Sequence, residues 1–329
     1  MSNDWLPFVE SVQKKNSDII YATLFGGNIL EVSNEKCRYI YRNASQKESF
    51  APIHFSIYFE NKKFFFNNKN EVIIIENGKC CVEIINNNLE ELYVPFVYDN
   101  SLEIIGCNST KRFAWTGKRF EFCDTLGEKG NWWTRRVTYN SYYINLWNND
   151  KHEILMFDIK KKKASFIKVD VPVINEVIEV NGALYIADTI GNMYVYDLKY
   201  HKMVKKVKNI CNNSIQLIVS YKGNIYCFCD KGNNVYITNA YNSIKKISIQ
   251  AESNSNIHWT RLSNELIFGI VEDEEFDEAY ILQFDLLINS DKIYNFKKMF
   301  YDSELGKKEY SIIVPESNFY SVKDFLKKI

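Results

Sequence analysis

Short apolar runs separated by turn residues recur along the chain, and the pattern is clearest between residues 175 and 207. Tyr, Val and Ile fill these runs, as they do in half-buried strands. Asn181-Gly182 and Gly191-Asn192 interrupt the runs and supply the positive φ that tight turns need. The pattern predicts four consecutive strands, at residues 176–180, 183–187, 192–196 and 202–207.

The same unit recurs at intervals of 39 to 44 residues, measured from Tyr185 in the predicted second strand. The matching apolar positions are Tyr21, Phe65, Ile104, Tyr143, Tyr226 and Phe268. A second marker agrees, because an aromatic residue followed by Asp ends the predicted third strand at Phe157-Asp158, Tyr196-Asp197 and Phe284-Asp285. We expect each of these Asp side chains to bond to the backbone of the turn that follows it.

Four short strands in every 40 to 45 residues are typical of a propeller blade. We therefore predict an all-β protein, a seven-bladed β-propeller of four-stranded antiparallel blades that forms one domain over residues 1–315. The predicted blades are residues 6–42, 54–85, 92–124, 132–169, 175–207, 215–249 and 257–300. A strand near 310–314 could follow. Residues 316–329 carry apolar side chains at helical spacing, which predicts an amphipathic C-terminal helix packed on the propeller.

Two arrangements of the chain ends remain open at this point. The N-terminal strand could serve as an innermost strand, or it could complete the last blade. Pairs of lysines on the predicted outermost strands, such as Lys205-Lys206 and Lys245-Lys246, are expected to block edge-to-edge association.

The first predicted blade ends its second strand in Gly26-Gly27. Together with the aromatic-Asp ends of the third strands, this Gly pair resembles the blade pattern of kelch-type propellers. The resemblance implies the propeller fold and a binding scaffold more often than an enzyme.

Composition narrows the function classes. The chain has 41 Lys and Arg and 41 Asp and Glu, so its net charge is zero, which argues against nucleic acid as a partner. The N-terminus lacks the basic and apolar regions of a signal peptide, and no apolar run reaches the roughly 18 residues of a membrane span. We expect a cytoplasmic protein without membrane insertion, whose eight cysteines are reduced and act as small apolar residues.

Two similar tripeptides are candidates for a binding site. Trp133-Thr134-Arg135 opens the fourth predicted blade and Trp259-Thr260-Arg261 opens the seventh, 126 residues or three periods of 42 later. Positions i and i+2 of a strand share a face, so each Trp and its Arg would point the same way. Trp offers a flat apolar platform and Arg a planar fork for carboxylate or phosphate. Alternatively, each Trp fills the gap between blades and each Arg lies in a wet channel.

Other candidates lie at the ends of the predicted strands. His54 and His258 begin innermost strands and could join the pocket, or they could be neutral packed histidines. Asp188 and Asp230 end second strands and could face a ligand at the mouth, or could only shape the turns. The acidic stretch 272–278 lacks the residue order of a calcium loop, and we expect neither a metal nor a cofactor.

Catalytic patterns are absent from the sequence. It contains no H-E-x-x-H, no G-x-S-x-G and no phosphate-binding loop, and only four His. We expect a non-catalytic scaffold that recognises a protein or peptide partner through the mouth face. The alternative is a glycan- or small-molecule-binding propeller, or a hydrolase or lyase, with a pocket of Trp133, Arg135, Trp259 and Arg261. Paired carboxylates from separate blades would still permit glycoside chemistry.

Overall fold

The structure is a computed structural model whose regular elements are all β-strands over the part of the chain that it describes. The described residues are 20–24, 29–32, 37–41, 53–85, 91–134, 143–238, 244–251, 255–261, 266–273, 278–295 and 311–315. The predicted C-terminal helix, residues 316–329, lies outside these ranges, as do Gly26-Gly27 and part of the acidic stretch. No helix in the described residues is long and apolar enough to span a membrane.

The chain divides into two compact units, which are described separately. The first unit comprises Met1–Gly130, Arg135–Asn140 and Lys298–Ile329, and the second comprises Asn131–Thr134 and Ser141–Lys297. Within the described residues the strands form seven sheets, and all of their pairings are antiparallel. Six of these sheets have four strands and one has three. The prediction of an all-β chain of four-stranded antiparallel sheets is confirmed.

The first unit contains three sheets, in the strand orders β27-β1-β2-β3, β4-β5-β6-β7 and β8-β9-β10-β11. Their bounds are β1 Ile20–Leu24, β2 Ile29–Val32, β3 Cys37–Tyr41, β4 Ile53–Phe59, β5 Lys62–Asn67, β6 Glu71–Glu76, β7 Lys79–Ile84, β8 Tyr93–Tyr98, β9 Ser101–Gly106, β10 Lys111–Trp115, β11 Phe120–Thr125 and β27 Ser311–Pro315.

The two ends of the chain meet in one sheet of this unit. Strand β27 pairs with β1, with Ile20 opposite Pro315 and Leu24 opposite Ser311. The sheet of the first predicted blade therefore takes one of its four strands, next to β1, from the C-terminal region. This arrangement differs from both options that the sequence left open, because neither option paired a C-terminal strand with the N-terminal sheet.

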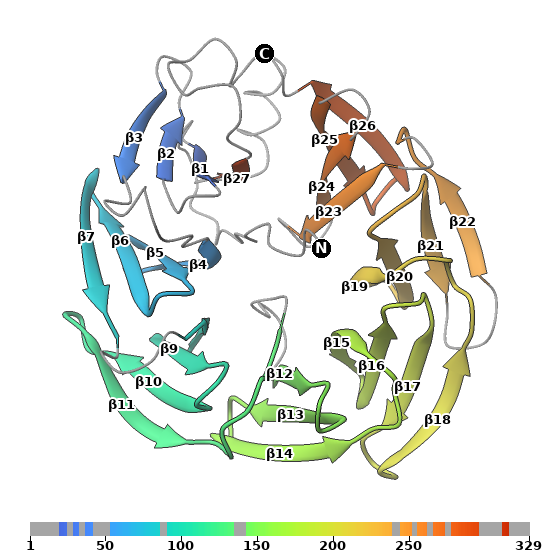
Figure 1. Cartoon of the computed structure of the whole chain (residues 1–329), viewed down its shortest axis with the longest axis horizontal. Coiled ribbons are helices and arrows are strands. Elements are labelled where there is room, and N and C mark those ends of the chain that lie inside the picture. The colour runs from blue at the N-terminus through green and yellow to red at the C-terminus, as the bar shows by residue number, and fades with distance from the viewer. Residues whose placement is uncertain are drawn as a thin grey trace. The chain divides into compact units, whose positions relative to one another are not determined.

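The second unit contains four sheets that follow one another in chain order (Figure 1). Their strands are β12 Tyr143–Asn148, β13 Glu153–Asp158, β14 Lys163–Lys168, β15 Ile174–Val180, β16 Ala183–Asp188, β17 Met193–Asp197, β18 Lys202–Val207, β19 Ile215–Tyr221, β20 Asn224–Cys229, β21 Asn234–Thr238, β22 Ile244–Ser248, β23 Asn256–Arg261, β24 Leu266–Asp273, β25 Glu278–Asp285 and β26 Ser290–Asn295.

The sheet of the fourth predicted blade is incomplete in the described residues. It contains β12, β13 and β14, and the expected first strand is represented only by an isolated bridge between Trp133 and Trp147. Residues 135–142 lie outside the described ranges. The other three sheets of the unit each have four strands, β15 to β18, β19 to β22 and β23 to β26.

Tight turns join the first and second strands of four sheets. Both residues of each turn have positive φ: Glu60 and Asn61, Asp99 and Asn100, Asn181 and Gly182, and Lys222 and Gly223. Two consecutive positive φ angles match the right-handed twist of the flanking strands. The Asn181-Gly182 turn is confirmed, and the first two turns adopt the same conformation without glycine.

The strands that flank these turns show that the predicted register of the repeat was displaced in three sheets. Five second strands are six residues long, and their third residues are Phe64, Glu103, Asn145, Tyr185 and Tyr226. The markers Phe65, Ile104 and Tyr143 were therefore displaced by one or two residues. Both faces of these strands are buried, so apolar residues occur at odd and even positions alike and do not define the register.

Apolar layers between neighbouring sheets form the core of the second unit. One layer packs Trp147 and Ile154 against Val177 and Tyr194, and a second packs Tyr185 and Val195 against Ile218 and Cys227. A third layer joins the last two sheets through Phe228, Trp259 and Phe284. Burial of each large apolar side chain contributes about 1.5–3 kcal/mol, so the sheets are held mainly by these layers.

The turns between third and fourth strands confirm the predicted role of the aromatic-Asp pairs. Asp158 Oδ1 accepts the backbone N–H of Lys161 at 2.9 Å. Asp197 Oδ1 accepts those of Lys199 and Tyr200 at 2.8 and 2.9 Å, and Asp285 Oδ1 accepts that of Leu287 at 2.8 Å.

Candidate functional site

One end of the second unit gathers the turns and connectors that carry most of the candidate residues. In a four-stranded antiparallel sheet, the turn after the second strand and the segment that leaves the fourth strand lie at the same end. We call this end the rim. It consists of residues 131–134, 148–152, 169–174, 188–192, 208–214, 230–233 and 255–257.

Hydrogen bonds join each rim segment to the next. Trp133 and Trp147 exchange both backbone bonds, at 2.7 and 2.8 Å. The Asn149 side chain then bonds to both backbone groups of Ile174, at 2.7 and 3.1 Å. Thr189 N–H donates to the Val173 carbonyl at 3.3 Å, and Asp230 N–H donates to that of Ser214 at 3.0 Å. The rim is therefore a fixed backbone platform rather than a set of independent loops.

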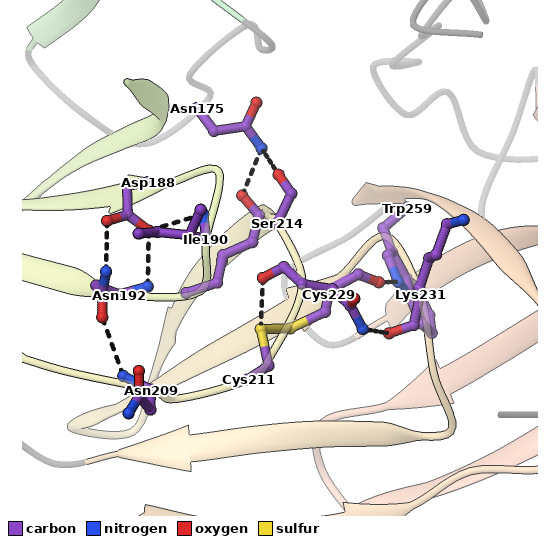
Figure 2. Close-up of a disulfide and its surroundings, with 12 residues drawn as sticks. Asn175, Asp188, Ile190, Asn192, Asn209, Cys211, Ser214, Cys229, Lys231 and Trp259 are labelled. Carbon is purple, nitrogen blue, oxygen red and sulfur yellow. Dashed lines mark hydrogen bonds between the residues drawn. A yellow bond between two sulfur atoms is a disulfide. The ribbon is translucent and has the colours of Figure 1, made fainter. Parts of the chain in front are cut away.

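Asp188 organises the turn of the fifth predicted blade, and its side chain is fully buried. Its Oδ1 accepts the backbone N–H groups of Ile190 and Asn192 at 3.0 and 2.7 Å. Its Oδ2 accepts the side chains of Asn192 and Tyr194 at 2.7 and 3.2 Å. Four donors thus occupy the carboxylate, and Figure 2 shows its bonds to Ile190 and Asn192. This supports the turn-shaping interpretation of Asp188.

The connector after β18 is tied to its surroundings at several points. Ile210 N–H donates to the Gly191 carbonyl at 2.9 Å, and Asn209 N–H donates to Asn192 Oδ1 at 3.0 Å. A side chain at Gly191 would collide with the Cys211 carbonyl, and its φ is +83°. Glycine is therefore required there by space and by conformation.

Cys211 in this connector forms a disulfide with Cys229 at the end of β20 (Figure 2). The expectation that all the cysteines are reduced was wrong for this pair. Spacing in the sequence did not reveal it, because the two residues are 18 positions apart and meet only when the connector folds back over the sheet. Cys107 and Cys227 are buried free thiols, and burial raises the pKa of Cys227 to about 12.

Trp259 lies inside the layer between the last two sheets, with 2% of its surface exposed. Its ring packs on Phe228 at 4.9 Å between centroids, and its indole Nε1 donates to the Cys229 carbonyl at 2.8 Å. Trp133 differs, because 43% of its surface is exposed on the rim. The two tryptophans therefore occupy different environments, and the interpretation that Trp fills a gap between blades fits Trp259.

The remaining predicted site residues are placed as follows. Arg135 lies outside the described residues. His258 and Arg261 lie in β23, whose pairing is described but not these two side chains. Asp230 is half-buried on the rim, and its carbonyl accepts the Ile257 N–H at 2.7 Å. His54 lies in β4 of the first unit, where burial lowers its pKa to about 4, so it is neutral at neutral pH.

His54 occupies a position that recurs in the first strands of several sheets and that sequence analysis missed. The register shifts after the first residue of β4, β15 and β19, which places a polar residue at each shift: His54, Asn175 and Gln216. Asn175 Nδ2 donates to Ser214 Oγ at 2.6 Å and to the Ile215 carbonyl at 2.8 Å. Gln216 Oε1 accepts the backbone N–H of Trp259 at 3.2 Å. In the second unit, Asn175 and Gln216 join one first strand to the next. The sequence signal for this position is an Ile followed by a polar residue, which recurs at the start of all three strands.

The rim also exposes apolar side chains that the sequence did not single out. Val173 is 42% exposed and Ile190 is 62% exposed. Both lie on the segments that the Thr189–Val173 hydrogen bond joins, so they are neighbours on the rim. Trp133, on the rim segment of the fourth predicted blade, is also exposed, and we call these three side chains the apolar set. Among the described residues, no group of three or more His, Cys, Asp or Glu is arranged to hold a metal ion.

Comparison with known proteins defines the fold class. No family model matches the chain, and no curated protein matches it. Among solved structures, the chain is similar to BamB from Moraxella catarrhalis, at 10% sequence identity and a TM-score of 0.54, over 80% of this chain and 81% of that one. It is similar to the WD40 β-propeller domain of Doa1, at 12% identity and a TM-score of 0.54, over 82% and 90%.

A third similar structure belongs to an enzyme. It is a catalytically inactive virginiamycin B lyase from Staphylococcus aureus with quinupristin, at 12% identity and a TM-score of 0.54, over 79% and 94% of the two chains. At these identities the likeness shows the fold alone. The protein has a β-propeller fold of the generic kind, and the similar structures do not single out the kelch family.

Proposed function

We propose that the protein is a non-catalytic β-propeller scaffold that binds a protein or peptide partner through the rim of the second unit. The observation that carries this proposal is the exposed apolar set of Trp133, Val173 and Ile190 on a backbone that hydrogen bonds hold in place. Apolar side chains surrounded by polar ones are typical of the centre of protein interfaces.

The stiffness of the rim supports the same proposal. A binding surface that is already ordered loses little conformational entropy when its partner arrives. Exposed charged residues lie on the rim near the apolar set, with Asp170 on the segment of Val173 and Asp150 and Lys151 on the segment that Asn149 joins to it. Such residues would supply the polar border of an interface. The seven sheets of the described residues support the seven-bladed count, which we also propose.

A small-molecule or glycan pocket of Trp133, Arg135, Trp259 and Arg261 is the alternative. It is favoured by the likeness to virginiamycin B lyase, whose structure was determined with quinupristin. It is disfavoured by the burial of Trp259, which leaves its ring no free face for a ligand.

A cytoplasmic location stays a prediction from the sequence, and the disulfide favours an oxidising compartment.

The test compares two triple variants in affinity capture from cells that produce the protein. The rim variant carries Trp133→Ala, Val173→Ser and Ile190→Ser. The matched control carries Val82→Ser, Leu287→Ser and Ile288→Ser, which remove equally exposed apolar side chains elsewhere. We expect the rim variant alone to lose the captured partner. Equal capture by the wild type and the rim variant would reject the proposal.

A further inference from the structure

Ten lysines lie in two short stretches, residues 160–168 and 199–208, five in each. Neither stretch contains an acidic residue. The whole chain balances 41 basic against 41 acidic residues, so these stretches hold a local excess of positive charge in a neutral protein. A charge excess of this kind acts on partners rather than on the fold.

Both stretches lie on the outer strands of two adjacent sheets. The first covers β14 and the turn before it, and the second covers β18 and the turn before it. β14 and β18 are the last strands of their sheets (Figure 1). The two sheets share one apolar layer. Four lysine side chains of each stretch are exposed. We call these eight exposed lysines the lysine belt.

Fewer acidic side chains than lysines lie beside the belt. Glu153 stands opposite Lys168 in the ladder of β13 and β14, and Asp188 and Asp170 act on Lys206. Asp158 pairs with Lys161 at 3.0 Å and is mostly buried. Asp197 is half-buried and accepts two backbone N–H groups of its own turn. Asp170 is an exposed acid beside the belt. Charges within a Debye length of about 10 Å act together, so the lysines of each stretch attract a polyanion jointly, and adjacent sheets carry the two stretches.

Exposed apolar side chains are interspersed with these lysines. Phe166 on β14 is 45% exposed, Tyr200 in the turn before β18 is 62% exposed, and Val204 on β18 is also exposed. The ammonium groups of Lys199 and Lys202 lie 5.3 and 5.7 Å from the centroid of the Tyr200 ring. Lysines combined with exposed aromatic residues are typical of surfaces that bind the headgroup region of a membrane.

We propose that the lysine belt binds the surface of an anionic lipid membrane, with Phe166 and Tyr200 entering the headgroup region and no segment crossing the bilayer. Two features favour lipid over other polyanions. The stretches contain lysine and no arginine, so they lack the planar fork that reads nucleic-acid bases. The pairing of β17 with β18 shifts register after Val195, and such a bulge disfavours addition of an extended acidic peptide to this edge.

The experiment is co-sedimentation of the full chain with vesicles of phosphatidylcholine alone or with about one third phosphatidylserine. The belt variant carries Lys199→Gln, Lys202→Gln, Lys206→Gln and Lys208→Gln. The control carries Lys79→Gln, Lys118→Gln, Lys245→Gln and Lys246→Gln, which remove four exposed lysines elsewhere and give the same net charge. Loss of each belt lysine should weaken binding about fivefold, and loss of all four several hundredfold.

We expect the wild type and the control to bind the anionic vesicles, and expect 0.5 M salt to abolish this binding, as screening requires. A Tyr200→Ala variant should bind more weakly with its charge unchanged. Three outcomes would overturn the proposal. They are equal binding to both vesicle types, equal weakening by the belt and control variants, and binding to single-stranded RNA or polyglutamate but not to vesicles. None depends on the rim, so capture of the rim's partner tests the proposed function separately.

Discussion

The two tryptophans that look equivalent in the sequence should differ strongly in their contribution to stability. The perturbation is replacement of each by alanine, in separate variants. Trp259 is almost fully buried between Phe228 and the following strands, whereas Trp133 is 43% exposed on the rim. The backbone of Gly269 lies so close to the Trp259 ring that an added Cβ would be 3.0 Å from it. The ring is therefore closely surrounded.

The structure sets the magnitude of each effect. Trp259→Ala removes a large buried ring and leaves a cavity, which costs about 3–5 kcal/mol of unfolding free energy. It also leaves the Cys229 carbonyl without the indole donor at 2.8 Å, and an orphaned buried acceptor costs about 1–3 kcal/mol. Trp133→Ala removes a ring that solvent already reaches and should cost about 1 kcal/mol. Trp259→Phe should fall between these values, because it keeps the ring contacts and loses the hydrogen bond.

Urea unfolding, followed by circular dichroism, measures all three variants under the same conditions. The expected order of stability is wild type, Trp133→Ala, Trp259→Phe and then Trp259→Ala. If Trp133→Ala destabilises as much as Trp259→Ala, the assignment of the two residues to different environments is wrong. A Trp259→Phe variant as stable as the wild type would show that the indole hydrogen bond contributes nothing.

Three further predictions concern single groups. Asp188→Ala should lower the unfolding free energy by about 3 kcal/mol, because four donors lose their acceptor; urea unfolding would show this, and a loss below 1 kcal/mol would contradict it. A reductant should destabilise the wild type by about 3 kcal/mol, because it opens the loop that the disulfide closes between Cys211 and Cys229, 18 residues apart. A Cys211→Ser and Cys229→Ser double variant should melt at the same temperature with and without reductant. The pKa of His54 is lowered to about 4 in the folded state, from about 6.5 unfolded, so its stabilising contribution is complete above pH 6.5 and is lost as pH falls toward 4. His54→Gln should reduce that loss by about 3 kcal/mol in acid unfolding, and an unchanged pH profile would refute the assignment.

Several features could be predicted from the sequence because they depend on neighbouring residues. The Asn181-Gly182 turn, the bonds of Asp158, Asp197 and Asp285 to their own turns, and the strands of the fifth blade all follow from local backbone preferences. The candidate site was harder to predict. Trp133 and Trp259 stand in the same tripeptide sequence, yet Trp133 is exposed and Trp259 is buried against Phe228 of the preceding sheet.

The sequence by itself determined the fold class, since the alternation of apolar strands and turns at a period near 40 residues leaves each sheet with two apolar faces that must be covered. Tertiary structure alone decided the register of the repeat, the Cys211–Cys229 bond, the pairing of β27 with β1 and the exposure of Val173 and Ile190. The physical reason is distance along the chain. A turn or strand is selected by interactions within a few residues, whereas each of these features depends on segments that become neighbours only after the sheets have packed.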